Sequence, residues 1–165
     1  MSSEIPENLK PENMPTITFT AGCGGSGKST ILAKMFPGLE GVDPDQIKLE
    51  MPGYDPLHPE LVHAASSVKA TRMFYAMLGA GRDFYFDGTG KNVEKYVGLI
   101  TAAKAAGFKT RILWVRAPLA TCLARNSARA RKVPLEVIVE THTAVEAAQA
   151  VLKHYVDEQI VVDNP

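Results

Sequence analysis

The sequence has few cysteines, no net charge and no long apolar run. Its 165 residues contain two cysteines, too few for a disulfide framework, and lysine plus arginine equals aspartate plus glutamate at 18 each. This balance gives no support for non-specific binding to nucleic acid. No apolar stretch approaches membrane-spanning length, so we expect no membrane partner. The N-terminus has neither a basic nor an apolar leader, and we expect a cytoplasmic protein.

One stretch of the sequence has no acidic residue at all. Between residues 111 and 132 the charged side chains are all positive: Arg111, Arg116, Arg125, Arg129, Arg131 and Lys132. Such a run is often only a solvated helix face. It also favours a polyanionic acceptor, so we expect a nucleic-acid or nucleotide partner. For the chain itself we expect a monomer or a small homo-oligomer.

The sequence contains a glycine-rich segment between an apolar run and a segment with a helical pattern. Residues 22–29 read Gly-Cys-Gly-Gly-Ser-Gly-Lys-Ser and fit the phosphate-binding pattern G-x-x-x-x-G-K-[ST]. Glycines let backbone N–H groups turn toward an anion, and the helix that follows adds its positive end. Lys28 can then reach the β- and γ-phosphates, and the Ser29 hydroxyl can bind Mg²⁺. We predict that ATP or GTP binds through Gly24, Gly25, Ser26, Gly27, Lys28, Ser29 and Thr30.

The rest of the chain alternates short apolar runs with helical segments. Residues 1–15 contain three prolines, and we expect a flexible arm there, followed by a single domain over 16–165. The patterns predict strands over 16–21, 83–87, 109–115 and 159–163, and a further short strand that ends at Val42. They predict helices over 28–36, 45–50, 60–78, 93–106, 118–130 and 134–155. Such alternation implies parallel β-α-β units. The predicted fold is an α/β three-layer sandwich with a mostly parallel sheet of about five strands, of the P-loop NTPase, nucleotide kinase-like type.

Two predictions concern which side chains form the core. On the 60–78 helix, the pattern predicts an apolar stripe, on or near which lie Leu61, Ala64, Ala65, Val68, Arg72 and Ala76, and which Met73, Met77 and Leu78 widen. The aromatic residues sit in apolar patterns and are expected to be core residues: Phe74, Tyr75, Phe84, Phe86 and Trp114.

Acidic residues follow two of the predicted strands, where ligands bind in sheets of this kind. Asp87 ends a Phe-Tyr-Phe strand and is a candidate Mg²⁺ ligand with Ser29, although an Asp before glycines is often only a turn cap. Asp43 and Asp45 compete for the role of general base. We prefer Asp45, because Asp43 precedes Pro44 and is the natural cap of the next helix. Lys48, one turn beyond Asp45, can pair with it.

The segment 125–134 joins two predicted helices and carries several positive charges. We interpret it as a lid that brings arginine onto the transferring phosphate. Arg125 and Arg129 share a helix face at i, i+4, and both are predicted to contact the nucleotide and to act in catalysis together with Lys28 and Asp45. Arg131 and Lys132 are equally compatible with an exposed basic turn.

Four blocks in this order resemble the P-loop kinases that include polynucleotide 5′-kinase and the zeta toxins. They are residues 22–29, Asp43-Pro44-Asp45-x-x-Lys48, Asp87-Gly88-Thr89-Gly90-Lys91-Asn92, and Arg125-Asn126-Ser127-Ala128-Arg129 followed by Val133-Pro134. The resemblance covers most of the chain, from about Thr16 to Asn164. It implies ATP- or GTP-dependent phosphorylation of a hydroxyl group.

The resemblance also implies residue roles. Asp45 matches the general base and Arg129 the lid arginine, and the substrate-binding residues would be Asp45, Lys48, Asp87, Thr89 and Asn92. Lys48 stands where an arginine is usual. A lysine keeps the charge but loses the bidentate fork, which would shift the acceptor preference.

Three functions are compatible with these observations. The first is a kinase acting on a nucleic-acid or nucleotide hydroxyl, either a sugar 5′-hydroxyl or a hydroxymethyl group on a modified pyrimidine, which would have to be flipped out of the duplex. The second keeps the fold and phosphorylates a small metabolite such as a UDP-amino sugar. The third is a nucleotide-binding switch without phosphotransferase activity.

Overall fold

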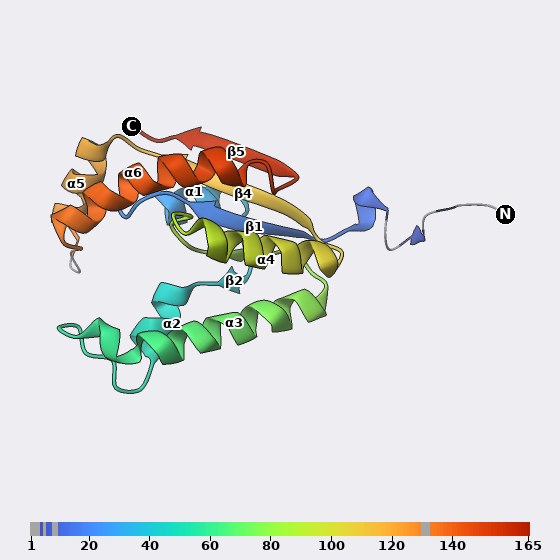
Figure 1. Cartoon of the computed structure of the whole chain (residues 1–165), viewed down its shortest axis with the longest axis horizontal. Helices are drawn as coiled ribbons and strands as arrows, with labels where there is room; N and C mark the ends of the chain where they lie inside the picture. Colours follow the sequence, from blue (N-terminus) through green and yellow to red (C-terminus); the bar gives the residue numbers. More distant parts are fainter. Residues whose placement is uncertain (1–3, 5, 8–9, 130–132) are drawn as a thin grey trace.

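The computed structural model describes residues 4, 6–7, 10–129 and 133–165. Residues 1–3, 5 and 8–9 of the expected N-terminal arm lie outside the described part, and so do 130–132 of the expected lid. Before the first strand, Pro11–Asn13 form a short 3-10 turn, η2. Figure 1 shows this turn standing away from the sheet and the helices that cover it.

The described part of the chain forms a five-stranded sheet with the strand order β2-β3-β1-β4-β5, and all its pairings are parallel. The strands are β1 (Thr16–Ala21), β2 (Gly41–Val42), β3 (Phe84–Phe86), β4 (Lys109–Arg116) and β5 (Glu158–Asp163). The strand that leads into the glycine-rich loop, β1, is therefore the central one. The predicted α/β fold with a parallel sheet of about five strands is confirmed.

Seven helical elements follow or join these strands: α1 (Lys28–Met35), α2 (Pro44–Glu50), η3 (Pro59–Val62), α3 (His63–Ala80), α4 (Val93–Ala105), α5 (Leu119–Ser127) and α6 (Leu135–Leu152). One face of the sheet is covered by α3, α4 and α6, and the other by α1, which packs on β4 (Figure 1). None of the helices in the described ranges is long and apolar enough to cross a membrane.

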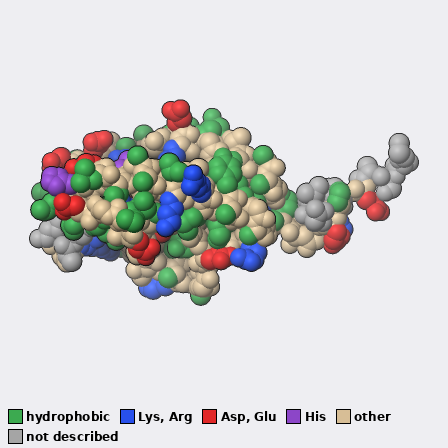
Figure 2. All heavy atoms as spheres, turned by 90° about the horizontal axis from the view of Figure 1, so that it is seen from below, with side chains coloured by type: hydrophobic (Ala, Val, Ile, Leu, Met, Phe, Trp, Pro, Cys, Tyr) green, Lys and Arg blue, Asp and Glu red, His purple; other side chains and the backbone are tan. Residues whose placement is uncertain are grey.

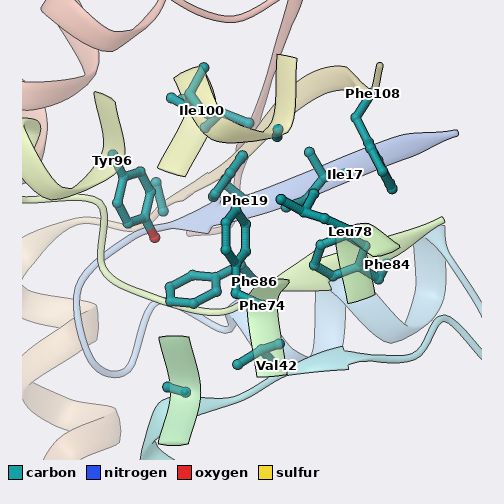
Figure 3. Packing of buried hydrophobic residues seen from close by; sticks show 14 of the residues in the cluster. Ile17, Phe19, Val42, Phe74, Leu78, Phe84, Phe86, Tyr96, Ile100 and Phe108 are labelled. Atoms are coloured by element: carbon teal, nitrogen blue, oxygen red, sulfur yellow. The ribbon is translucent and has the colours of Figure 1, made fainter. Parts of the chain in front are cut away.

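The main core lies between the sheet and its larger helical layer. Alternate side chains of a strand point to one face, so Phe19 of β1 and Phe86 of β3 both enter this core. Phe74 of α3 meets Phe86 edge to face, with ring centroids 5.9 Å apart, as the close view in Figure 3 shows. Each fully buried side chain of this size contributes about 1.5–3 kcal/mol. Aromatic packing thus fixes β1 and β3 side by side, and with them the loops at their carboxyl ends.

The inward face of α3 differs from the predicted stripe. The buried residues recur every fourth position: Ser66, Ala70, Phe74 and Leu78. Leu61 and Val68, expected to be inside, are 70% and 52% exposed, and Tyr75 is 55% exposed. The prediction was wrong for these three residues because apolar residues occur on both sides of this helix, whereas Phe74 and Leu78 are buried as predicted. Ser66 can be buried because its hydroxyl donates to the His63 carbonyl at 2.9 Å.

The start of α2 follows the predicted capping pattern. The Asp43 side chain accepts a hydrogen bond from the Gln46 backbone N–H at 3.1 Å, and Pro44 occupies the first helical turn. The segment between this helix and η3 is irregular, as its prolines and glycine predict. Asp43 is therefore the helix cap.

Candidate active site

A cavity of about 460 Å³ lies where the carboxyl ends of β1 and β3 meet. The glycine-rich loop forms its floor, and every predicted nucleotide-binding residue from Gly24 to Thr30 lines it. Other elements of the fold add Asp45, Asp87, Thr89, Lys91, Arg125 and Arg129. Its size is that of a typical small-molecule site.

The loop backbone depends on glycine at three positions, one of which is Gly22 with a φ angle of 141°. Gly25 and Gly27 have φ angles of 86° and 93°, in the left-handed region that other residues avoid. A Cβ on Gly25 would lie 2.7 Å from the Cys122 carbonyl oxygen, so α5 packs directly on the loop. Ser26 Oγ is buried and has no hydrogen-bond partner within the described ranges. An unpaired buried hydroxyl in this loop fits a site that is completed by a polar ligand.

Lys28 opens α1 at the end of the loop. Its Nζ donates to the Gly22 carbonyl oxygen at 2.7 Å, so the ammonium group bends back over the loop. A phosphate in the cavity would compete with this carbonyl for the ammonium group. Ser29 and Thr30, in the first turn of α1, are exposed toward the same cavity.

Asp87 is held by the neighbouring strand. Its Oδ1 accepts a hydrogen bond from Thr20 Oγ1 at 2.6 Å, while the Gly88 N–H donates to the same hydroxyl oxygen at 3.0 Å. Burial raises the pKa of Asp87, and the nearby Lys28 ammonium opposes that rise. The buried Tyr96 hydroxyl donates to the Thr20 carbonyl at 2.7 Å. Thr20 and Tyr96 were not found from the sequence, because an alternating threonine and a helical tyrosine carry no motif.

The chemistry of Ser29 and Asp87 fits a magnesium ion. Both line the main cavity and also a smaller adjoining one of about 220 Å³. The described residues contain no group of three histidine, cysteine or acidic side chains arranged for a metal. Mg²⁺ in nucleotide sites needs only one or two protein oxygens, because phosphate oxygens and waters complete its shell. One carboxylate and one hydroxyl beside a phosphate cradle therefore suffice.

The two candidate bases occupy different environments. Asp45 is exposed and lines the main cavity, whereas the Asp43 side chain is engaged at the N-terminus of α2. Lys48 lies elsewhere: its Nζ is 3.3 Å from His63 Nδ1 at the start of α3, and it does not pair with Asp45 in the described structure. The predicted Asp45–Lys48 pair is therefore not formed.

The two predicted lid arginines also differ. Arg125 Nη1 donates to the carbonyl oxygens of Gly25 and Ser26, both at 3.1 Å, so this side chain clamps the loop from outside. Arg129 lies over the cradle, with Nη1 3.7 Å from the position of a Cβ on Gly24. Arg131 and Lys132 lie outside the described residues. Of the two, Arg129 has the guanidinium group directed at the phosphate site.

Arg111 and Arg116, the other described basic residues of the stretch 111–132, do not line this cavity. Arg111 forms an ion pair with Glu158 at 3.0 Å. Arg116 pairs with Glu146 at 3.1 Å and stacks on Trp114, with the guanidinium 4.9 Å from the ring centroid. These partners come from distant parts of the chain, so two of the positive charges in the acid-free stretch are paired with acids in the described structure.

The loop after β3 matches the predicted set of substrate-binding residues only in part. Thr89 and Lys91 line the cavity, and Lys91 Nζ is 3.5 Å from the Thr141 hydroxyl of α6. The Asn92 side chain instead accepts from the Lys95 N–H at 3.1 Å and caps α4. Buried Gln149 donates to the Gly90 carbonyl at 3.2 Å and supports this loop. Lys91 lay inside a recognised block, but Thr141 and Gln149 had no sequence signal.

The family relationship rests on most of the chain. The model of a family described as an AAA domain, AAA_33, matches residues 17–152. The chain belongs to this family. Comparison with curated protein sequences gives no match. The matched range contains the loop, Asp45, Asp87 and Arg129.

Several solved structures share the fold. One is AvrRxo1-ORF1:-ORF2 with ATP, with 21% identity and a TM-score of 0.67, covering 90% of this chain and 52% of that one. Another is from the PezAT toxin-antitoxin system of Streptococcus pneumoniae, with 16% identity, a TM-score of 0.71, and coverage of 92% and 69%. A third is shikimate kinase from Acinetobacter baumannii with shikimate, with 15% identity, a TM-score of 0.55, and coverage of 93% and 87%.

These similarities establish the fold and no more. The chain spans about half the length of the AvrRxo1-ORF1:-ORF2 chains it matches, at 52–53%. It shares its fold with these structures, so the expected P-loop kinase-like fold is confirmed. The narrower resemblance to polynucleotide 5′-kinase and zeta toxins stays a prediction.

Proposed function

We propose that the protein is an ATP-dependent kinase that transfers the γ-phosphate to a hydroxyl group of a nucleic-acid or nucleotide substrate. The observation that carries this proposal is the shared cavity of Lys28 and Asp45. The Lys28 ammonium group, which would bind the phosphates, and the Asp45 carboxylate, which would bind the acceptor, line the same cavity. A site that only bound nucleotide would have no need of the second group.

The chemistry assigned to each residue follows from its position. The backbone N–H groups of the loop and Lys28 hold the triphosphate. Asp45 accepts the proton of the attacking hydroxyl, and the Arg129 guanidinium stabilises charge on the transferring group. Ser29 and Asp87 would hold Mg²⁺, which would supply positive charge to neutralise the phosphate oxygens. Phosphoryl transfer needs little more than such positioning and charge.

Positive charge in the cavity and on α3 supports a polyanionic acceptor. Lys91 is exposed in the cavity, and α3 carries exposed Lys69 and Arg72 and no acidic residue. Figure 2 shows that the face of the molecule seen there mixes acidic, basic and hydrophobic side chains. On that face a polyanion would meet local positive groups and no continuous basic surface. Either a 5′-hydroxyl or a hydroxymethylated pyrimidine in DNA meets this description.

A small-metabolite acceptor, such as a UDP-amino sugar, is the alternative. The ion pairs of Arg111 and Arg116 favour it, because they remove two charges that a long polyanion would use. A non-catalytic nucleotide switch is the third candidate, and it predicts ATP binding without transfer to any acceptor.

The deciding experiment uses γ-labelled ATP with Mg²⁺ and three acceptor classes. These are oligonucleotides with a free 5′-hydroxyl, DNA containing hydroxymethylated pyrimidines, and UDP-amino sugars. We expect label on one of the two nucleic acids, and a loss of roughly 10²-fold or more in rate for Asp45→Asn.

Glu50→Gln is the matched control. This residue lies on the same helix as Asp45 and is exposed, and it does not line the described cavity. The substitution keeps the hydrogen bond that Gln46 donates to it, so the rate should not change. Label on the sugar alone would move the proposal to the small-metabolite kinase. ATP binding with no transfer at all would support the switch.

A further inference from the structure

Two cysteines from distant parts of the chain touch beside the cradle. Cys23 is the second residue of the glycine-rich loop and Cys122 lies in α5, 99 positions later in the sequence. Their sulfur atoms are 2.6 Å apart, and the residues are 4% and 0% exposed. None of the steps proposed for phosphoryl transfer uses either thiol.

The geometry is close to that of a disulfide. A sulfur–sulfur bond is about 2.05 Å long, so the two atoms need to approach by only about 0.5 Å. The backbones are already in contact, because a Cβ on Gly25 would lie 3.2 Å from the Cys122 Cα. Metal binding has no support, since the described ranges hold no group of three suitable side chains. The surroundings are instead an apolar cluster that includes Ala117 and Ile138.

We propose that Cys23 and Cys122 are an oxidation site at which peroxide forms a disulfide that weakens nucleotide binding to the loop. The effect on affinity rests on the proposed nucleotide-binding function, whereas the bond itself does not. One thiolate attacks a peroxide oxygen, and the O–O bond breaks to leave a sulfenic acid and hydroxide. The second sulfur then displaces the hydroxyl group and the sulfur–sulfur bond forms. In total, two thiols and one hydrogen peroxide give one disulfide and two waters.

The disulfide between Cys23 and Cys122 would restrain the part of the loop that must adjust when a phosphate binds. Lys28 holds the Gly22 carbonyl at 2.7 Å, and this hydrogen bond must be exchanged when a triphosphate enters. Cys23 directly follows Gly22, and a bond to α5 would tie that turn in place. Arg125, one turn after Cys122, already holds the middle of the loop at Gly25 and Ser26. The disulfide would therefore tie the loop to α5 at a second point and restrict its adjustment to a phosphate.

The Cys23 thiol is protected at neutral pH. Burial, followed by the hydrogen bond with Cys122, raises the pKa of the Cys23 thiol to about 12, against a smaller opposing effect of Lys28. Only the thiolate reacts, so the oxidation rate should rise about tenfold per pH unit below that value. Cys23 lines the cavity, so bound nucleotide covers it and should slow the reaction. By thermodynamic linkage, bound ATP should also disfavour the disulfide form, because that form binds ATP less tightly.

The test compares the reduced wild type with Cys122→Ala after exposure to hydrogen peroxide at pH 7, 8 and 9. Mass spectrometry of digested protein detects the Cys23–Cys122 peptide, and calorimetry measures ATP affinity. We expect the cross-linked peptide in the wild type, faster formation at higher pH and slower formation with ATP and Mg²⁺ present. We also expect at least tenfold weaker ATP binding, restored by dithiothreitol. In Cys122→Ala, peroxide should leave the affinity unchanged, and Cys122→Ser serves if the alanine variant does not fold.

Two results would overturn the proposal. One is a wild-type protein whose thiols both stay free under conditions that oxidise an exposed thiol. The other is a cross-linked protein that binds ATP as tightly as the reduced one. If the reduced protein binds no nucleotide, the proposed function fails, and the effect on affinity fails with it. Mass spectrometry would still show whether peroxide joins Cys23 to Cys122, so the two failures are distinguishable.

Discussion

At the scale of single residues, the site depends on a buried threonine that has no motif of its own. Thr20 donates to Asp87, accepts from the Gly88 N–H, and offers its carbonyl to Tyr96. These bonds set the direction of the carboxylate and of the loop that follows it. Burial raises the pKa of Tyr96 well above its ordinary value, so the hydroxyl stays a neutral donor.

Replacing Tyr96 by phenylalanine tests this network. The change removes one donor and leaves the Thr20 carbonyl buried without it, which should lower the free energy of unfolding by about 1–3 kcal/mol. Tyr75→Phe is the matched control, because that residue is 55% exposed and should change stability by no more than about 0.5 kcal/mol. Urea unfolding of the three proteins measures both values. Equal stability of the two variants would refute a structural role for the Tyr96 hydroxyl.

At the scale of elements, α3 shows why a helix can be predicted while its inward face is not. Apolar residues occur along more than one side of this helix, and the hydrophobic pattern alone does not choose between them. The aromatic residues of β3 decide the face, because Phe74 packs against both Phe84 and Phe86. Local sequence thus determines the helix, and contact with the sheet determines its rotation.

Paired substitutions on α3 measure this choice. Phe74→Ala removes a fully buried ring and should lower the free energy of unfolding by about 3–5 kcal/mol. Val68→Ala, expected from sequence to be inside, should change it by less than about 1 kcal/mol, because the side chain is 52% exposed. Chemical denaturation checks both variants. A larger effect for Val68 than for Phe74 would show that the helix presents its other face to the sheet.

At the scale of the whole molecule, parallel strands bring together residues that are far apart in the chain. The central β1 leads into the loop, Asp87 directly follows its neighbour β3, and α2 begins one strand further out (Figure 1). Connections after parallel strands emerge at one edge of the sheet. The cavity is therefore a consequence of topology, and ligand binding should stabilise the whole fold.

Thermal unfolding with ATP and Mg²⁺ tests that consequence. A ligand at one hundred times its dissociation constant adds about 2.7 kcal/mol. For a chain of this size we expect Tm to rise by roughly 5–11 °C, from about 2–4 °C per kcal/mol. Lys28→Ala should remove most of this shift, while Lys34→Ala, an exposed residue later on the same helix, should retain it. An unchanged Tm for the wild type at saturating nucleotide would contradict nucleotide binding.

Much of the fold and part of the site could be predicted because their signals are local. The loop, the cap at Asp43 and the alternation of strands and helices depend on residues within a few positions of one another. The choice of Asp45 over Asp43 came from the same local capping rule, and its position along the cavity agrees with that choice. Resemblance to known kinases then indicated which blocks would meet.

The sequence by itself determined the strand–loop–helix unit, the parallel α/β class and the acidic residues at the strand ends. Only the tertiary structure decided which face of α3 is buried, that Lys48 lies against His63, and that Arg111 and Arg116 are paired with distant acids. It also decided that the two cysteines touch. These features depend on contacts between segments separated by tens of residues, and no local pattern encodes such contacts.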